Sequence, residues 1–521
     1  MNESLFKRLL DYYHLDEKDY QELIKPVDEN NFAFGHEFKD IDKAIDIINE
    51  TIDREGKIFI YGDYDADGVM GCSILVKMFL YRNVQADYYL PNRYVDGYGL
   101  TLKKAQECID NKVSLVITID NGVSALEPIK LLKDNGIKIL VLDHHTVPEE
   151  LPPADVILHP QYSDFGETPA SAGFVSFMFS IKFLGYYDKY LATLASISLI
   201  SDMMPLLDYN RNLLRVVFSS YKDGEFFPID ALKEGEPFNE VTIGMRIAPK
   251  INAIGRLING PEINRLVTFF TSNEKEELLH YIEWINSINE ERKLASKESA
   301  SNLGEFSKDD GAIVYITEAK EGLLGLIANS LMNTHHVPVI VMTLDQSGEG
   351  YKGSCRAPEG FNVAESFENL KEYMLVYGGH AGAGGCTVLK ENIEAFTKAF
   401  KEYATKHPPV YVEKEVIDLS ITEVTLDNYR LIHSFSPFGE GHKAPLFKIR
   451  RVYTPSLSFS RNGEHILTPI GNSSKIVGFN ISKQVLQGLQ FIDIIGTLKS
   501  SSYKGYSYVE FNISKYEPTK A

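Results

Sequence analysis

The sequence predicts an α/β protein: a doubly wound parallel sheet domain, joined by a long helix to a second α/β domain and followed by a C-terminal β-barrel. Three observations support this prediction. Near-continuous Val, Ile and Leu runs alternate with helical stretches over residues 57–160, as expected for strands buried on both faces of a parallel sheet. A charged amphipathic stretch occupies 271–302, and short strand-like runs separated by Gly, Asn and Ser begin near residue 411.

The strands of the first domain are the runs KIFIYGD, SLVITIDNG, IKILVLDHH and DVILHP, with the helical stretches GVMGCSILVKMFLYRN and SALEPIKLLKDNG between them. One further helical stretch, FVSFMFSIKFLGYYDKYLATLASISLISD, leads to another acid, Asp202. With 521 residues the chain is too long for a single core. We therefore expect several domains.

The stretch TSNEKEELLHYIEWINSINEERKLASKESASN opens with a capping sequence and repeats apolar residues at Leu278, Ile282, Ile285 and Ile288. It predicts a long helix that either lies on one domain or connects two. A second α/β unit follows from GAIVYIT. The predicted boundaries are a helical extension over 1–50, the sheet domain over 51–270, the connecting helix over 271–305, the second α/β domain over 306–408 and the barrel over 409–521.

Composition excludes several classes of protein. With 44% apolar and 24% charged residues the chain is a folded one, and no apolar run is long enough for a membrane span. The N-terminus lacks a secretory signal, so we expect a cytoplasmic protein. Four Cys without a CxxC pair predict neither a disulfide framework nor a zinc site. The net charge of −19 argues against nucleic-acid binding, although residues 411–521 hold 13 Lys and Arg against 10 Asp and Glu.

Acidic residues follow three of the predicted strands, in IFIYGDYDAD, LVITIDNG and ILVLDHH. The carboxyl ends of parallel strands meet at one edge of a sheet, so these side chains should converge. A single Asp after a strand is more often a turn former or helix cap, but repeated capping is the weaker explanation for so many acids beside a His pair. Carboxylates with imidazole suit Mn²⁺, or Mg²⁺, and two ions would balance the charge.

The motifs GDYDADG, IDNG, LDHH and SDMMPL, in this order, resemble those of the DHH phosphoesterase superfamily. Further on, APKINAIGRL, GLLGLIANSL, GSCRAPEGFN, GGHAGAGG and SFSPFGEGHKAPLF resemble one branch of it, the bacterial exonucleases specific for single-stranded DNA. The resemblance runs from about residue 35 to the C-terminus. It implies a DHH domain, a connecting helix, a DHH-associated domain and an OB-fold.

The resemblance also implies roles for individual residues. Asp65 and Asp120 would hold one metal ion, with Asp63 joining it or lying behind it. The second ion would be held by Asp67, Asp120, His144 and Asp202. Asp143 would orient His144 or His145, and His145 would contact the scissile phosphate as the catalytic acid. The implied substrate-binding residues are Arg93, Asn252, Arg256, Ser354, Arg356, Gly378, Gly379 and His380.

The implied activity is 5′-to-3′ hydrolysis of single-stranded DNA to 5′-mononucleotides, for DNA repair and recombination. The barrel would bind the strand through some of Phe447, Tyr453, Phe459 and Tyr508 with Lys448, Arg450 and Arg451. A monomer is expected, with single-strand-binding protein and a helicase as partners implied by the family only. Competing hypotheses are a phosphodiesterase of cyclic dinucleotides or short RNA, a binding protein with a dead site, and an inorganic pyrophosphatase.

Overall fold

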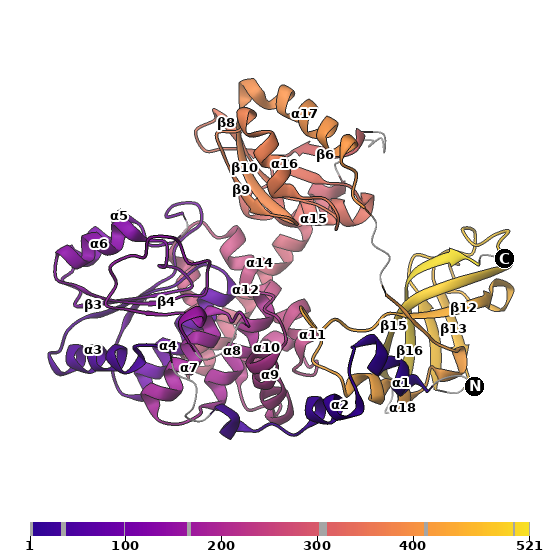
Figure 1. Cartoon of the computed structure of the whole chain (residues 1–521), viewed down its shortest axis with the longest axis horizontal. Helices are drawn as coiled ribbons and strands as arrows, with labels where there is room; N and C mark the ends of the chain where they lie inside the picture. Colours follow the sequence, from indigo (N-terminus) through magenta and orange to yellow (C-terminus); the bar gives the residue numbers. More distant parts are fainter. Residues whose placement is uncertain are drawn as a thin grey trace. The chain divides into compact units, whose positions relative to one another are not determined.

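The computed structural model describes residues 4–32, 38–97, 99–163, 168–301, 310–410, 415–471, 473–503 and 506–519. The chain forms two compact units, whose elements are labelled in Figure 1. Unit 1 comprises residues 1–28, 205–207 and 413–521, and unit 2 comprises residues 29–204 and 208–412. All the predicted metal-binding residues therefore lie in unit 2.

A five-stranded parallel sheet with the order β2-β1-β3-β4-β5 forms the first part of unit 2. The sequence predicted four of its strands, β1 (Ile58–Tyr61), β3 (Leu115–Ile119), β4 (Lys138–Leu142) and β5 (Val156–Leu158). It missed the edge strand β2 (Asp87–Tyr89), which has no buried residue and so no apolar run.

Helices cover both faces of this sheet, as expected for a doubly wound fold (Figure 1). One face packs against α5 (Leu102–Asp110) and α6 (Leu126–Asp134). The other packs against α4 (Ala66–Tyr81) and α7 (Ala172–Leu184), and α3 (Ile41–Asp53) contacts β5. The predicted fold class is confirmed for this part of the chain.

The helical stretch before Asp202 is two helices, not the single stretch that the sequence predicted. Gly185 adopts a left-handed conformation, φ +83°, and its N–H bonds to the carbonyl of Ile181, which ends α7. Asp188 then accepts the N–H of Leu191 and begins α8 (Lys189–Ser201). The helices that follow are α9 (Asp208–Ser220), α10 (Phe227–Lys233), α11 (Glu240–Thr242), the π-helical turn η3 (Ile243–Ile247), α12 (Ala248–Leu257) and α13 (Arg265–Thr271).

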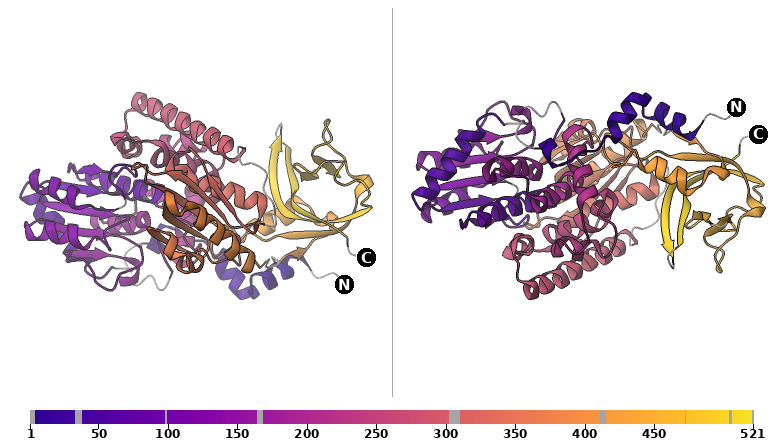
Figure 2. Two further views of the ribbon diagram at one scale, coloured as in Figure 1. Left: turned by 90° about the horizontal axis from the view of Figure 1, so that it is seen from above. Right: turned by 90° about the horizontal axis from the view of Figure 1, so that it is seen from below.

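The predicted long helix is α14 (Lys275–Ser301), which has 27 residues. Leu278, Ile282 and Ile285 are buried as their spacing predicted, and Ile288 packs against a neighbouring apolar cluster. The helix contacts α12 before it and α15 (Leu324–His335) after it, so it connects the two α/β parts of unit 2. Figure 2 shows α14 along one margin of this unit.

The second α/β part contains a mixed sheet with the order β6-β7-β8-β10-β9. Only β6 and β7 are parallel, and the later strands pair antiparallel. The strands are β6 (Ile313–Ile316), β7 (Val339–Leu344), β8 (Gly350–Arg356), β9 (Val376–His380) and β10 (Ala383–Leu389). The helices besides α15 are α16 (Val363–Asn369) and α17 (Ile393–Lys406).

Unit 1 is built on a six-stranded mixed sheet with the order β11-β12-β15-β16-β14-β13. All five strand-like runs of the tail are strands: β12 (Phe447–Tyr453), β13 (Ile466–Ile470), β14 (Ser474–Gly478), β15 (Phe491–Tyr503) and β16 (Tyr506–Pro518). A short strand, β11 (Ile417–Asp418), and α18 (Leu426–His433) complete its C-terminal part. The sheet is consistent with the expected OB-type barrel.

The N-terminal helices α1 (Leu5–Tyr12) and α2 (Glu17–Ile24) also belong to unit 1. Leu9 and Tyr20 are buried in the same apolar core as Phe435 and the barrel strands. The segment 1–50 is thus divided between the units, because α3 lies in unit 2. Among the described residues, every helix is too short or too polar to cross a bilayer.

Candidate metal centre and arginine cluster

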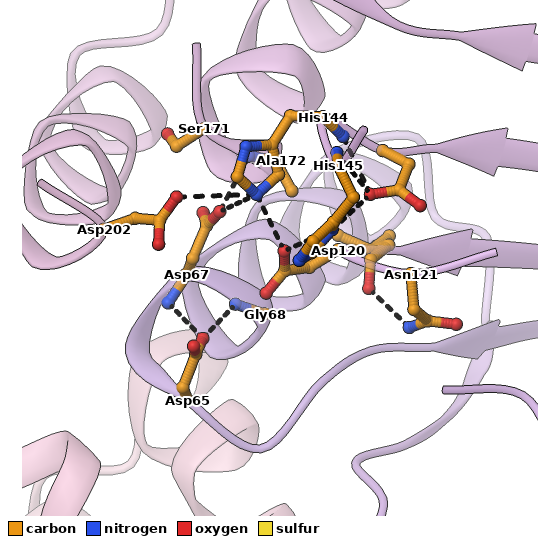
Figure 3. A network of polar contacts seen from close by, with 12 residues as sticks. Asp65, Asp67, Gly68, Asp120, Asn121, His144, His145, Ser171, Ala172 and Asp202 are labelled. Carbon is orange, nitrogen blue, oxygen red and sulfur yellow. Dashed lines mark hydrogen bonds and ion pairs between the residues drawn. The ribbon is translucent and has the colours of Figure 1, made fainter. Parts of the chain in front are cut away.

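Acidic side chains converge at the carboxyl ends of the first sheet's strands, as their sequence positions predicted (Figure 3). Asp63, Asp120 and Asp143 follow β1, β3 and β4, and all three are buried. Asp202 is the C-terminal cap of α8. Because parallel strands present these ends at one edge, Asp63 and Asp143, 80 positions apart in the sequence, share one site.

Asp65 and Asp67 are positioned by helix ends. Asp65 is the N-cap of α4, and its Oδ1 accepts the N–H groups of Asp67 at 2.9 Å and Gly68 at 3.2 Å. Asp67 accepts the N–H groups of Ala172 and Gly173, both at 2.8 Å, at the start of α7. Capping therefore explains one oxygen of Asp65 but not the gathering of the other acids around it.

His144 lies among three carboxylates (Figure 3). Its Nε2 is 3.1 Å from Asp120 Oδ1, 3.4 Å from Asp202 Oδ2 and 3.5 Å from Asp67 Oδ2. Asp120 reaches this position from a left-handed backbone conformation, φ +62°, directly after β3. The ligand atoms of Asp67, His144 and Asp202 lie within 4.8 Å of one another, which is close enough to hold a cation.

A second such group consists of Asp63, Asp65 and Asp120, again within 4.8 Å. Asp63 Oδ1 is buried and has no hydrogen-bond partner among the described residues, and Asp202 Oδ2, also buried, makes no hydrogen bond but lies 3.4 Å from His144 Nε2. A buried, unpaired carboxylate oxygen is costly unless a cation or a donor meets it. The donors are oxygens with one imidazole nitrogen, so both groups fit hard divalent ions such as Mn²⁺ and Mg²⁺.

The pKa values of this cluster show the cost of its charges. Burial raises the pKa of Asp63 and of Asp120 well above the usual value, and the neighbouring carboxylates raise both further. Burial and the charges of Asp67 and Asp65 raise the pKa of Asp202 to about 8. Burial lowers the pKa of His144, which favours the neutral imidazole that binds metals.

His145 bonds to Asp143, and its Nδ1 also lies 3.8 Å from Asp120 Oδ1, which together with His144 forms a third possible cation-holding group. Asp143 Oδ1 lies 2.8 Å from His145 Nδ1 and accepts the N–H of His144, while its Oδ2 accepts the N–H of Val123. Burial alone would lower the pKa of His145, but the hydrogen bond and charge of Asp143 outweigh it and raise this pKa. Of the two orientations that the sequence left open, the structure has Asp143 on His145.

A pH dependence of stability follows from these pKa values. A carboxyl group whose folded pKa is raised stabilises the fold while protonated, and this contribution is lost as pH rises from about 4, its unfolded pKa, through the folded pKa. For Asp202 that window ends at about 8. We expect the metal-free protein to lose stability between pH 5 and pH 8, and Mn²⁺ to restore it.

Thermal melts in chelator and in Mn²⁺ at each pH would measure this effect. The difference in Tm between the two conditions should grow with pH and reach roughly 5 °C at pH 8 if Mn²⁺ is about 100-fold above its Kd. Groups outside the cluster contribute equally to both melts and cancel. A difference that is the same at pH 5 and pH 8 would contradict the metal assignment.

Four arginines gather beside the metal centre, and we call Arg93, Arg256, Arg292 and Arg356 the arginine cluster. Burial, followed by the charges of Arg93, Arg292 and Arg356, lowers the pKa of Arg256 to about 10. The Arg93 guanidinium lies 4.5 Å from the centre of the Tyr64 ring, between Asp63 and Asp65 in the sequence. None of the four forms an ion pair with any carboxylate that the structure describes.

Ser354 and Arg356 meet as predicted, since Arg356 Nη1 donates to Ser354 Oγ at 3.2 Å. Asn252 Oδ1 accepts the N–H of Ala66 at 2.8 Å, in the loop that carries Asp65 and Asp67, and its predicted contact with substrate stays a prediction. Its oxygen thus positions the loop between Asp65 and Asp67. Arg256, one turn later on α12, donates to the carbonyl of Gly322 at 3.1 Å.

The predicted residues Gly378, Gly379 and His380 lie on β9, the exposed edge strand of the second sheet. A Cβ at Gly378 would meet no atom within 4 Å, whereas one at Gly379 would lie 2.4 Å from the carbonyl of Ala383. Among the described contacts, none joins these three residues to the metal centre or the arginine cluster. Their substrate-binding role stays a prediction.

Two of the three basic residues expected to bind DNA on the barrel, Lys448 and Arg450, are already paired with acids, while the Arg451 guanidinium lies 5.0 Å from the centre of the Phe491 ring. Lys448 lies 3.4 Å from Asp493 and 3.3 Å from Glu517, and Arg450 bonds to Asp418. Phe447 is buried in the core, while Tyr453 is 45% exposed. Phe459 and Tyr508 are partly buried, so Tyr453 is the one expected aromatic that presents a wide surface.

Arg292 was not among the residues predicted from the sequence. A signal for it existed, because Arg292 stands seven residues after Ile285 and four after Ile288, on the apolar side of α14. A charged residue on that side indicates either a buried ion pair or a ligand. In the structure its Nε is buried and has no hydrogen-bond partner among the described residues.

Convergent acids at the end of a doubly wound sheet, a histidine among them and an adjoining arginine cluster define a metal-dependent phosphoesterase. Family models match three parts of the chain: the DHH family N-terminal domain at residues 57–200, the DHHA1 domain at 309–406 and the RecJ OB domain at 417–515. The chain belongs to the RecJ family of DHH phosphoesterases.

Individual relatives agree with this family. The chain is 29% identical to the single-stranded-DNA-specific exonuclease RecJ of Bacillus subtilis over 91% of its length, and spans 63% of that relative. It is 28% identical to RecJ of Haemophilus influenzae, with 99% of this chain and 96% of the relative covered. The crystal structure of RecJ from Thermus thermophilus in complex with Mn²⁺ has the same fold, with a TM-score of 0.84 and 22% sequence identity. The match covers 99% of this chain and 76% of the Thermus chain.

Proposed function

We propose that the protein is a metal-dependent exonuclease that degrades single-stranded DNA from its 5′ end and releases 5′-mononucleotides. One observation carries the proposal: overlapping groups of cation ligands lie beside a cluster of arginines that form no ion pair within the described part of the chain. Charges act across this boundary, since Arg93 lowers the pKa of Asp63 and Asp65 raises that of Arg256. Such a site suits a phosphodiester close to a second, terminal phosphate.

We assign Asp63, Asp65 and Asp120 to one divalent ion, and Asp67, Asp120, His144 and Asp202 to the other. Mn²⁺ or Mg²⁺ bound there supplies neutralisation of the phosphoryl oxygens and activation of a water molecule. The chain's own groups fix the geometry: Asp67 is anchored to the start of α7, Asp65 to that of α4, and Asn252 holds the loop between them.

His145 is the group we assign to proton transfer. Its Nδ1 bonds to Asp143, so its Nε2 is the atom that would face a substrate, and its side chain is 42% exposed. The raised pKa keeps a larger fraction of the imidazole protonated near neutral pH, as a general acid requires. Its proton would go to the leaving 3′ oxygen of the departing nucleotide.

The polarity of digestion rests on the arginine cluster. Guanidinium forks bind a terminal phosphate through two parallel hydrogen bonds, and Ser354 Oγ adds a hydroxyl donor beside Arg356. A 5′-phosphate held there would set the first phosphodiester over the acids. Exonucleolytic cleavage one nucleotide at a time would follow from that spacing.

The test is a digestion with Mn²⁺ of single- and double-stranded DNA and RNA, each labelled at either end. The 5′ label should appear first as a mononucleotide, from single-stranded DNA, while the 3′ label stays in long products. Early release of the 3′ label would contradict the polarity. Hydrolysis of cyclic dinucleotides or short RNA in place of long strands would favour a small-substrate phosphodiesterase.

Further expectations depend on this activity. A single-strand exonuclease would serve DNA repair and recombination, act in the cytoplasm and meet single-strand-binding protein and a helicase, which produce or cover its substrate. A protein with a dead site is disfavoured, because the acids and His144 that form both ligand groups are present and converge.

A further inference from the structure

Three hydrogen bonds hold the carboxylate of Asp67, two on one oxygen and one on the other. Oδ1 accepts the N–H of Gly173 at 2.8 Å and the hydroxyl of Ser198 at 2.5 Å. Oδ2 accepts the N–H of Ala172 at 2.8 Å. Asp67 is 1% exposed, so these donors stand where water would solvate a carboxylate at the surface.

Two of the donors belong to the start of α7 and the third to α8. The first N–H groups of a helix have no partner within it, and the positive end of the helix dipole favours a carboxylate there. Ser198 differs, because its hydroxyl reaches across to Asp67. On the same helix the buried Ser196 bonds instead to the carbonyl of Thr193, within its own helix. Ser198 therefore serves the carboxylate and not its own helix.

A second hydroxyl orients the first. Ser171 Oγ lies 2.5 Å from Ser198 Oγ, and both side chains are fully buried. Because the hydroxyl hydrogen of Ser198 is used on Asp67, Ser171 is the donor in this pair. Ser171 is itself fixed as the N-cap of α7, where its oxygen accepts the N–H of Phe174 at 3.4 Å. The hydrogen bonds thus run in one direction, from Ser171 through Ser198 to Asp67, and strengthen one another.

The close approach of Ser198 to Asp67 depends on a glycine. A Cβ at Gly173 would lie 2.4 Å from Ser198 Oγ and 3.3 Å from Asp67 Oδ1. A side chain at this position would push the hydroxyl away from the carboxylate. The absence of one leaves room for the hydrogen bond between α8 and Asp67.

The hydrogen bonds leave Asp67 one oxygen for a cation. A carboxylate has about four acceptor positions, two on each oxygen. Among the described contacts, both positions on Oδ1 and one on Oδ2 are filled. Oδ2 is also the atom that faces the other ligands, since it lies 3.5 Å from His144 Nε2 (Figure 3).

We propose that Ser198, oriented by Ser171, is a positioning residue for metal binding, and that it holds Asp67 so that the carboxylate binds its divalent ion through Oδ2 alone. The inference rests on the proposed assignment of Asp67 to a metal ion. A carboxylate that binds through one oxygen occupies one coordination position. More positions of the ion then stay open to water and to a phosphoryl oxygen, as two-metal hydrolysis requires.

The experiment titrates the full-length protein with Mn²⁺ and follows the electron paramagnetic resonance signal of the free ion. The wild-type protein should bind two ions, and Asp67→Asn should lose one of them. In Ser198→Ala one ion should bind about 10- to 100-fold more weakly, the usual effect of removing a group that orients a metal ligand. Ser171→Ala should fall between Ser198→Ala and the wild type, because its hydroxyl acts through Ser198.

The matched control is Ser196→Ala, which removes a fully buried hydroxyl from the same helix. It should bind both ions as the wild type does. A cooperative melt in chelator shows that each variant is folded. If Ser198→Ala does not fold, Ser198→Cys takes its place with the same expected loss, because a thiol fills the space but is a weak donor.

Nuclease activity at increasing Mn²⁺ is a second readout. The rate that Ser198→Ala loses should return as Mn²⁺ is raised, because the substitution weakens binding of an ion and leaves the ligands in place. A rate that stays low at every Mn²⁺ concentration would contradict the proposed role.

Mn²⁺ binding in Ser198→Ala equal to that of the wild type would overturn the proposal, as would an equal loss in Ser196→Ala. The metal assignment and the role of Ser198 fail separately. If Asp67→Asn binds Mn²⁺ as well as the wild type, the assignment of Asp67 to an ion is wrong. If Asp67→Asn loses an ion and Ser198→Ala does not, the metal assignment stands and only the role of Ser198 is removed.

Discussion

Asp120→Asn is expected to abolish DNA hydrolysis, by more than about a thousandfold, while leaving the metal-free fold as stable as before or more so. Asp120 adjoins both ligand groups, so its loss would impair both. Its pKa is raised well above the usual value by burial and by the charges of four neighbouring carboxylates, which makes its ionised form costly. Asn has the same shape, carries no charge and tolerates the left-handed conformation of this position.

Three measurements on Asp120→Asn test this expectation together: nuclease activity, the Tm in chelator and the Tm rise in Mn²⁺. The first and third should be lost and the second kept. Asp53→Asn, at the exposed end of α3, makes the same chemical change away from the site and should alter none of them. Activity within tenfold of the wild type would end the metal assignment, and a collapse of the Tm in chelator would show that Asp120 is structural.

The sequence predicted that the acids after β1, β3 and β4 converge, because this convergence follows from the topology of the sheet. Because β1, β3 and β4 are parallel neighbours, the residues that follow them lie at one edge of the sheet. These residues are Asp63, Asp120, Asp143, His144 and His145. The side chains positioned by tertiary packing could not be found in this way. The bond from the N–H of Ala66 to Asn252, 186 residues away, was not predicted, because it depends on the packing of α12 against the loop that carries Asp65 and Asp67.

Other differences have equally local causes. The helical stretch before Asp202 divides at Gly185, where a left-handed turn competes with continuous apolar periodicity. The edge strand β2 lacks the burial that produces an apolar run. The pairing of Lys448 and Arg450 with acids of neighbouring strands depends on register, which a sequence does not reveal.

The helix α12 connects the two halves of the candidate site. Asn252 bonds to the metal-binding loop, and Arg256 belongs to the arginine cluster one turn later. Tyr64, within the loop, lies under the Arg93 guanidinium. The distance between the metal ligands and the phosphate-binding groups is thus set by how closely α12 approaches Tyr64, and a glycine stands at that contact.

Gly255→Ala is the second change for which we expect a large effect. A Cβ at this position would lie 2.3 Å from the carbonyl oxygen of Tyr64, a backbone atom that cannot turn away. Ala in place of Gly inside a helix usually stabilises by up to about 1 kcal/mol. Here the clash should reverse the sign, destabilise by roughly 1–3 kcal/mol and shift the metal-binding loop, with about a hundredfold loss of activity.

Gly244→Ala provides the matched control for Gly255→Ala. Gly244 lies in η3, just before α12, and the nearest atom to its Cβ would be Ile200 Cγ2 at an ordinary 3.7 Å. This variant should keep both activity and Tm, or gain slightly in Tm. If Gly255→Ala is as active and stable as Gly244→Ala, then α12 does not press on the loop. If it loses activity without loss of the Mn²⁺-dependent Tm rise, the displaced element is the arginine cluster, since the metal ligands would then be intact.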